Sequence, residues 1–207
     1  MKTLAFTIAL FGSTICLSQS NNDIVPSEPI KQSEFSLGLK GGFGHSFIIP
    51  YSNYTFNSSW DAGISATYSP WQHFGFGLDA LYSQEGGAFI YHTNRETPKE
   101  IRTTTLNYVR VPVKVIYFFN TYEHDFRPKI SVGPTVGFLM NEVNASNANF
   151  LDVGANATLG FNYRLARAVW FNADASYYQG LTDIYDTNTE NDYNGNLRLD
   201  LGISLGF

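Results

Sequence analysis

The sequence is poor in cysteine and in cationic residues. Cys16 is the only cysteine among 207 residues, and it lies in a segment that we expect to be removed, so the mature chain offers neither a disulfide framework nor thiolate metal ligands. Lys and Arg total 13 against 18 Asp and Glu, a net charge of −5. A surface that binds nucleic acid needs clustered Lys and Arg. No such cluster occurs, so nucleic acid is not an expected partner.

Long apolar runs are also missing after the N-terminal segment. A membrane helix needs roughly 20 consecutive apolar residues. The nearest candidate, Val109–Phe119, is interrupted by Arg110 and Lys114. Spanning strands remain possible, because their alternating residues do not raise the average hydropathy.

The first 18 residues have the composition of a secretory signal peptide. A positively charged start precedes the apolar run Leu4–Leu17, which is too short to cross a bilayer as a helix. The small residue Ser18 suits signal peptidase and predicts Gln19 as the new N-terminus, with cleavage after Ser20 as an alternative. Lipidation at Cys16 is a second alternative.

Residues 19–34 are polar, contain two prolines and show no hydrophobic periodicity. We interpret them as a disordered periplasmic lead-in, because they have no apolar face to bury.

From Phe35 onward the sequence has a period of two, seen most clearly at its C-terminal end. Six apolar residues alternate there with six polar or small ones: Leu197, Leu199, Leu201, Ile203, Leu205 and Phe207 against Asn196, Arg198, Asp200, Gly202, Ser204 and Gly206. In a strand the two sets point to opposite sides, whereas a helix would scatter them around its circumference. The segment is therefore predicted to be a strand with one apolar and one polar face.

The same alternation recurs in seven further segments, with Leu81 as the main exception. The predicted strands are Phe35–Phe43, Trp60–Tyr68, Phe74–Ser83, Tyr108–Tyr117, Lys129–Met140, Asp152–Tyr163, Val169–Tyr177 and Asn196–Phe207. Their lengths of 9 to 12 residues suit tilted membrane strands, which need roughly 9–11 residues. Residues 35–207 are therefore predicted to form an all-β, eight-stranded antiparallel up-and-down transmembrane β-barrel.

The predicted connections alternate between short and long. Three are short, at Ser69–His73, Asn120–Phe126 and Arg164–Arg167, and four are longer and polar, at Ser46–Ser58, Gln84–Thr104, Asn141–Phe150 and Thr182–Gly195. Outer-membrane barrels have short turns at the periplasmic rim and long loops outside. An even number of strands then places both termini in the periplasm.

The strand YVRVPVKVIY (Tyr108–Tyr117) resembles a segment of the PorT-like outer-membrane β-barrel family. LYSQEGG (Leu81–Gly87), ISVGPTVGFLM (Ile130–Met140) and YYQGLTDI (Tyr177–Ile184) are similar to its neighbouring segments, in the same order. The chain also ends on Phe207, an aromatic residue of the kind that the barrel assembly machinery recognises. The resemblance implies an eight-stranded barrel of a Gram-negative cell envelope. The founding member is linked to a protein-secretion system, a role that does not transfer on fold alone.

The polar faces of the predicted strands carry five cations and five carboxylates. They are Lys40, Arg110, Lys114, Lys129 and Arg198, and Asp61, Asp79, Asp152, Asp174 and Asp200. The interior of an eight-stranded barrel is just wide enough for side chains to fill it. We therefore expect an ion-pair network in the lumen that neutralises itself. A narrow polar pathway or proton relay is the alternative.

Other residues offer weaker hypotheses. His45 and Ser46 lie where some outer-membrane lipid hydrolases place such a pair, but no orienting acid can be identified. The oxygen-rich stretch Asp183–Asp192 is a weak Ca²⁺ candidate that lacks EF-hand spacing, and a solvated loop is the simpler interpretation.

Seven aromatic residues near strand ends are expected to form an interfacial girdle: Trp60, Tyr68, Trp71, Phe74, Tyr82, Tyr117 and Tyr163. A sugar- or base-stacking surface is the alternative for these rings.

Together these features predict a non-enzymatic outer-membrane barrel without a cofactor or metal, with an envelope structural, interaction or secretion-associated role. Its expected partners are membrane lipid, the assembly machinery and envelope or secretion-system proteins. One alternative is a soluble lipocalin-like barrel whose apolar face points inward and binds an apolar ligand. A second is an outer-membrane lipid-modifying hydrolase.

Overall fold

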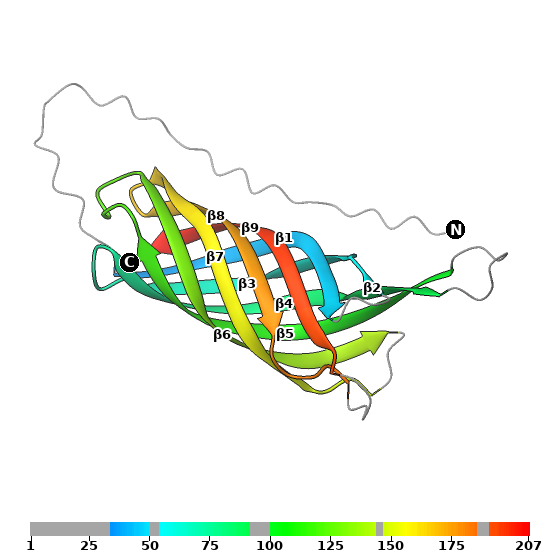
Figure 1. Ribbon diagram of the computed structural model, residues 1–207. Helices are drawn as coiled ribbons and strands as arrows, with labels where there is room; N and C mark the ends of the chain where they lie inside the picture. The colour runs from blue at the N-terminus through cyan, green and yellow to red at the C-terminus, as the bar shows by residue number, and fades with distance from the viewer. Residues whose placement is uncertain (1–33, 50–53, 92–99, 144–146, 186–190) are drawn as a thin grey trace, which may run out of the picture.

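The chain forms a closed antiparallel β-barrel (Figure 1). The computed structural model describes residues 34–49, 54–91, 100–143, 147–185 and 191–207. The strands are β1 (Phe35–Ile49), β2 (Tyr54–Thr55), β3 (Asn57–Tyr68), β4 (Phe74–Tyr91), β5 (Glu100–Phe118), β6 (Phe126–Val143), β7 (Leu151–Ala166), β8 (Val169–Gly180) and β9 (Tyr193–Gly206). β2 pairs only with β4, and the other eight strands form the barrel, which the β4–β5 pairing closes. The predicted fold class is confirmed.

No helix in these residues is long and apolar enough to cross a membrane.

The alternation of side chains sets the inside and outside of the barrel. On β9, Leu201 is 57 % exposed whereas its neighbour Asp200 is 1 % exposed. Leu199 and Ile203 are likewise exposed, and Arg198 is buried. The apolar face therefore points outward and the polar face inward, which is the reverse of a lipocalin-like barrel. Leu81, the exception to the predicted alternation, is buried in the lumen.

The strand register fixes the width of the barrel. The register can be followed from each residue to its partner on the next strand until the path has gone once around the barrel. It passes through Phe35, Tyr68, Phe76, Val115, Val132, Ala157, Tyr177, Leu197 and His45. The path returns to β1 ten residues beyond its start, at 45 instead of 35. With a rise of about 3.3 Å per residue and about 4.8 Å between strands, this shear corresponds to a strand tilt of roughly 40°. The interior is therefore narrow enough to be filled by side chains.

The two ends of the barrel differ in their connections (Figure 1). We call the turn rim the end that carries the β3–β4, β5–β6 and β7–β8 turns, the start of β1 and the C-terminus. The loop rim is the opposite end. Aromatic side chains gather near both: Phe74 and Tyr117 lie 5.1 Å apart, between ring centroids, near the turn rim, and Trp60 and Tyr82 lie 5.6 Å apart near the loop rim. The predicted girdle residues are exposed, except Tyr117, which is half-buried.

The four long connections are shorter in the structure than the sequence predicted, because the strands beside them are longer. β4 continues to Tyr91 and β5 begins at Glu100, so most of the predicted Gln84–Thr104 loop is a hairpin. β1 extends to Ile49, β6 to Val143, and β9 begins at Tyr193. Strand pairing continues past the apolar band, where the sequence no longer has to alternate because the outward face is not required to be apolar. The short turns are confirmed, although β7 extends to Ala166 and shortens the third one.

Candidate functional site

The polar interior of the barrel is the candidate functional site. All ten charged residues predicted to face the lumen point into it, and they come from all eight strands of the barrel. Their side chains form two clusters, one nearer each rim.

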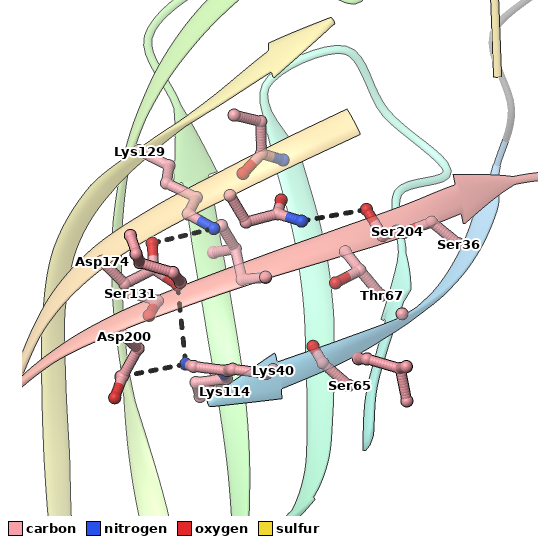
Figure 2. A pocket seen from close by; sticks show the side chains of 17 residues that line it. Ser36, Lys40, Ser65, Thr67, Lys114, Lys129, Ser131, Asp174, Asp200 and Ser204 are labelled. Carbon is pink, nitrogen blue, oxygen red and sulfur yellow. Dashed lines mark hydrogen bonds and ion pairs between the residues drawn. The ribbon is translucent and has the colours of Figure 1, made fainter. Parts of the chain in front are cut away.

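The cluster nearer the turn rim is built on three lysines (Figure 2). Lys40 Nζ lies among three carboxylates, at 3.2 Å from Asp200, 3.5 Å from Asp174 and 3.7 Å from Asp79. Lys114 contacts Asp79 at 2.5 Å and Lys129 contacts Asp174 at 3.0 Å. Every ammonium group of this cluster therefore has a carboxylate partner on another strand.

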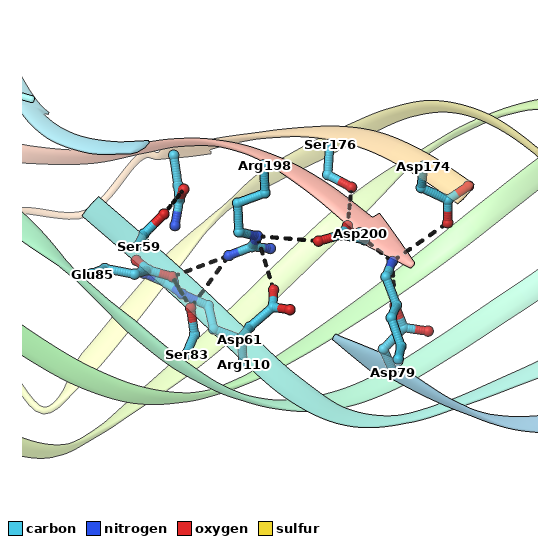
Figure 3. A network of polar contacts seen from close by, with 12 residues as sticks. Ser59, Asp61, Asp79, Ser83, Glu85, Arg110, Asp174, Ser176, Arg198 and Asp200 are labelled. Atoms are coloured by element: carbon cyan, nitrogen blue, oxygen red, sulfur yellow. Dashed lines mark hydrogen bonds and ion pairs between the residues drawn. The ribbon is translucent and has the colours of Figure 1, made fainter. Parts of the chain in front are cut away.

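The cluster nearer the loop rim is built on two arginines (Figure 3). Arg110 of β5 contacts Glu85 of β4 at 2.6 Å and Asp152 of β7 at 2.7 Å, measured from Nη2 to carboxylate oxygens. Arg198 of β9 contacts Asp61 of β3 at 2.8 Å.

Aromatic rings complete the surroundings of Arg110. Its guanidinium lies over the rings of Tyr108 and Tyr178, at 4.4 and 4.1 Å from their centroids, and the residue is 2 % exposed. Arginine suits this position because its planar fork binds carboxylates and aromatic faces at once.

The two clusters touch at Asp200. Its carboxylate lies 3.7 Å from Arg198 Nε and 3.2 Å from Lys40 Nζ, and it also accepts a hydrogen bond from Ser176 (Figure 3). Hydroxyl and amide groups continue the network toward the loop rim, where Ser59 donates to Asn196 and Asn194 donates to Asp152. The pairs thus cross-link strands from all sides of the barrel.

Glu85 is a central residue that the sequence interpretation missed. It was placed in a predicted loop, but it is fully buried and bonds to Arg110 and Ser83. The signal was present in the sequence, because Asp79, Leu81, Ser83 and Glu85 keep one inward parity along β4. The two positions beside Glu85 on the other face of the strand, Gln84 and Gly86, are not apolar, and this hid the alternation there.

The turn rim is filled by arginines stacked on aromatic rings, which sequence reasoning also missed. Arg127 is 3 % exposed and lies 4.0 Å from the centroid of Phe118. Arg164 lies 4.6 Å from the centroid of Trp170, and its guanidinium donates to the carbonyl oxygen of Tyr122. These side chains occupy the mouth of the lumen at this rim.

A small apolar cluster occupies the lumen at the loop rim. It contains Ile48, Leu106, Tyr108 and Ile184, all buried. Asn149 donates its backbone N–H to the carbonyl oxygen of Ile184 at 2.7 Å, which ties the β6–β7 connection to the β8–β9 connection. The described side chains therefore fill the interior from one rim to the other, and small cavities of about 30 and 20 Å³ lie nearer the turn rim.

The predicted hydrolase pair does not form. His45 is exposed and packs edge-on against Phe56, whereas Ser46 is fully buried. As neighbours on β1 they point to opposite faces, so His45 cannot take the hydroxyl proton of Ser46.

The predicted calcium stretch lies partly outside the described residues, at 186–190. The Asp183 carboxylate accepts hydrogen bonds from the backbone N–H groups of Tyr185 and Asp192, at 3.2 and 3.0 Å, and so holds the loop. Across the described part of the chain, no group of three His, Cys, Asp or Glu side chains could hold a metal ion.

The predicted N-terminal features lie outside the described residues, apart from Glu34. At the other end, Phe207 is exposed, and its backbone N–H donates to the carbonyl oxygen of Phe35 at 2.7 Å. The C-terminal aromatic residue therefore lies beside the start of β1, on the outer surface at the turn rim.

Comparison with known proteins agrees with this architecture. The family described as "Outer membrane protein beta-barrel domain" matches residues 17–186. The structure is similar to that of Neisserial surface protein A, with a TM-score of 0.54 and 17% sequence identity over 84% of this chain and 98% of that one. It is also similar to the outer membrane protein OprG from Pseudomonas aeruginosa, with a TM-score of 0.59 and 14% identity over 87% of this chain and 99% of that one. At such identities the likeness concerns the fold alone. No curated protein sequence matches the chain.

Proposed function

Because the chain belongs to the outer membrane protein β-barrel domain family, we propose that it is a non-enzymatic envelope protein that acts through its two rims and not through a pore. Membership of this family supports a location in the outer membrane. The observation that supports the proposal is the filled interior, with apolar side chains at the loop rim, ion pairs in the middle and stacked arginines at the turn rim. A lumen closed in three layers leaves the loops and turns as the surfaces for partners.

The proposed orientation has the turn rim in the periplasm. Short turns face the periplasm in barrels of this kind. The C-terminal strand, with Phe207, would then be presented to the assembly machinery from the periplasmic side, and the interlocked connections around Asn149 and Ile184 would face the exterior.

The secretion-associated role implied by the PorT-like resemblance is a finer form of this proposal. Within the resembling segment, Arg110 and Lys114 point into the lumen and bind carboxylates. Val113 and Val115 point outward and are exposed on the barrel wall. The segment therefore supports the barrel itself, and a secretion partner would have to bind at the turn rim or the loops.

Recordings in planar bilayers test the proposal. The purified protein should give no large, steady conductance, because ion pairs fill the lumen. Co-purification from crosslinked membranes should recover an envelope protein attached to a rim residue. A stable porin-like conductance would contradict the proposal and favour the polar-pathway alternative.

A further inference from the structure

The charges in the lumen are not evenly balanced along the barrel axis. The cluster nearer the loop rim has the two cations Arg110 and Arg198 against three carboxylates, those of Asp61, Glu85 and Asp152. The cluster nearer the turn rim has three lysines against three aspartates, and the buried Arg127 adds a fourth cation beyond it. Counted over these buried side chains alone, the loop-rim half therefore carries one surplus negative charge and the turn-rim half one surplus positive charge. The count leaves out the exposed Glu34 and the Arg164–Asp125 pair at the turn rim.

The surplus positive charge belongs to Arg127. Its guanidinium donates to the carbonyl oxygens of Gln72 at 3.0 Å and Asn120 at 3.3 Å, and it stacks on Phe118. Arg127 is only 3 % exposed, and its contacts among the described residues are with backbone carbonyl oxygens and aromatic rings and include no ion pair with a carboxylate. Carbonyl dipoles offset only part of the desolvation of a buried cation, so an anion beside it would be stabilised.

A polar cavity adjoins Arg127. The cavity of about 20 Å³ is lined by Arg127 and by the hydroxyl-bearing residues Ser36, Thr67, Ser69 and Ser204. It shares Ser36, Thr67, Asn162 and Ser204 with the cavity of about 30 Å³ that reaches Lys114 and Lys129 (Figure 2). The two cavities are therefore neighbours that share these four polar residues, one beside Arg127 and the other beside the lysine cluster.

A buried hydroxyl group without a partner also borders the cavity beside Arg127. Tyr122 lines this cavity and is 6 % exposed, and its hydroxyl has no hydrogen-bond partner among the described residues. A buried polar group that is left unpaired costs free energy, so an occupant that accepts its hydrogen bond would be stabilised.

Most of the other polar groups that line the two cavities can donate a hydrogen bond, although the buried side-chain oxygen of Asn162, which lines both, is an acceptor without a partner among the described residues. Guanidinium, ammonium and hydroxyl groups can all direct hydrogen atoms toward an occupant. The carboxylates of Asp174 and Asp200 line the deeper cavity and are already paired with lysines. Glu34 lines the shallower one, at the turn rim.

We propose that the cavity beside Arg127 binds a small inorganic anion of halide size. Each of the two volumes holds an occupant about as large as one or two water molecules, which excludes phosphate and organic carboxylates. The charge surplus and the hydroxyl donors favour an anion over a neutral occupant. This inference does not depend on the proposed function or on the orientation in the membrane.

Chloride binding to the refolded full chain in detergent micelles tests the proposal. The linewidth of the ³⁵Cl resonance should increase in the presence of the wild-type protein, and bromide should reverse this by competition. Arg127→Gln should weaken the binding by roughly tenfold or more, because it removes the charged donor. Arg167→Gln is the matched control, since it removes an exposed arginine at the same rim, and it should leave the binding unchanged.

Two further measurements keep the test decisive if Arg127→Gln does not fold. Crystals of the wild-type protein soaked in bromide should show an anomalous peak beside Arg127 and Ser204. Glu34→Gln should leave chloride binding unchanged or strengthen it. If chloride bound only to Glu34→Gln, the Glu34 carboxylate would be the partner of Arg127 in the native chain, and the proposal would be wrong. Equal line broadening in the wild type and Arg127→Gln, or no bromide peak, would also overturn it.

Discussion

The outer wall and the lumen of this barrel are built from alternate residues of the same strands, yet they are held by different forces. On the outer wall, exposed residues such as Leu199 and Leu201 make few specific contacts and need only to be apolar. In the lumen, Arg198 and Asp200 each depend on named partners at fixed distances. The effect of a substitution on stability should therefore depend on the polarity of the new residue on the outer wall. In the lumen it should depend on which partner loses its contact.

The largest effect is expected from breaking the ion pairs of Arg110. Arg110→Met leaves the buried carboxylates of Glu85 and Asp152 without their main cation. Removing one partner of a buried pair typically lowers the free energy of unfolding by about 3–5 kcal/mol. Urea unfolding in lipid vesicles, followed by tryptophan fluorescence, measures the change.

A control uses the pair Arg164–Asp125 at the turn rim, in which the side chain of Arg164 is 6 % exposed and that of Asp125 is 70 % exposed, so that Asp125→Asn changes only the solvated partner. Because solvent screens such a pair, Asp125→Asn should change the stability by about 0–1 kcal/mol. Equal effects of the two substitutions would mean that the lumen is hydrated and that its ion pairs do not stabilise the barrel.

The next largest effect is expected on the outer wall. Leu201 lies midway along the outward face of β9 and pairs with Gly41 and Ala173. Leu201→Arg places a charge near the bilayer midplane and should lower stability by about 2–4 kcal/mol. Leu205→Arg, which lies near the turn rim, should cost less because the side chain can reach the interface. The same unfolding assay compares the two, and a larger loss for the Leu205 variant would contradict the placement of the membrane.

The smallest effect on stability is expected from alanine substitutions at two neighbouring glycines, which lie on opposite faces of β1. Gly42 points inward, between Asp61 and Asp200, and an added methyl group would overlap the Asp200 carboxylate. Gly42→Ala should therefore lower stability by about 1–3 kcal/mol. At Gly41, which points outward, the nearest atom to such a group is the Asp61 carbonyl oxygen at 3.5 Å. Gly41→Ala should be neutral or stabilise by up to about 1 kcal/mol. A larger loss at Gly41 than at Gly42 would reverse the assignment of the faces.

The sequence predicted the wall better than it predicted the lumen, and the reason is physical. Alternation alone tells which residues of β9 face outward, because every outward position obeys the same apolar rule. The partners in the lumen depend on the ten-residue shear, which brings Lys40 beside Asp174 and Asp200, and no local pattern encodes this offset.

The ends of the barrel were predicted least well. Glu85 was missed because β4 continues past the apolar band, where the outward-facing residues are no longer apolar and the alternation is no longer visible in the sequence. The cluster of Ile48 and Leu106 with Ile184 joins two strands to a connection far away in the sequence, so only the closed fold brings these residues together. Arg127 lies two residues before Lys129 on β6 and points inward like it, but it lies next to a turn, where the alternation of side chains gives little information.

Spin labels on adjacent residues of β9 test most directly whether the apolar face of the barrel meets lipid and the polar face lines the lumen. Cys16 is the only cysteine in the chain. If it is not removed with the signal peptide, Cys16→Ser removes it, so a label can be attached at residue 201 or at residue 200 without background. In reconstituted bilayers, the label at Leu201 should collide readily with oxygen, which concentrates in hydrocarbon, and poorly with a water-soluble metal complex. The label at Asp200 should lose this preference for oxygen, since neighbouring strand residues point to opposite faces. A label at 201 that is shielded from both reagents would mean that the apolar face points inward, and would contradict the account.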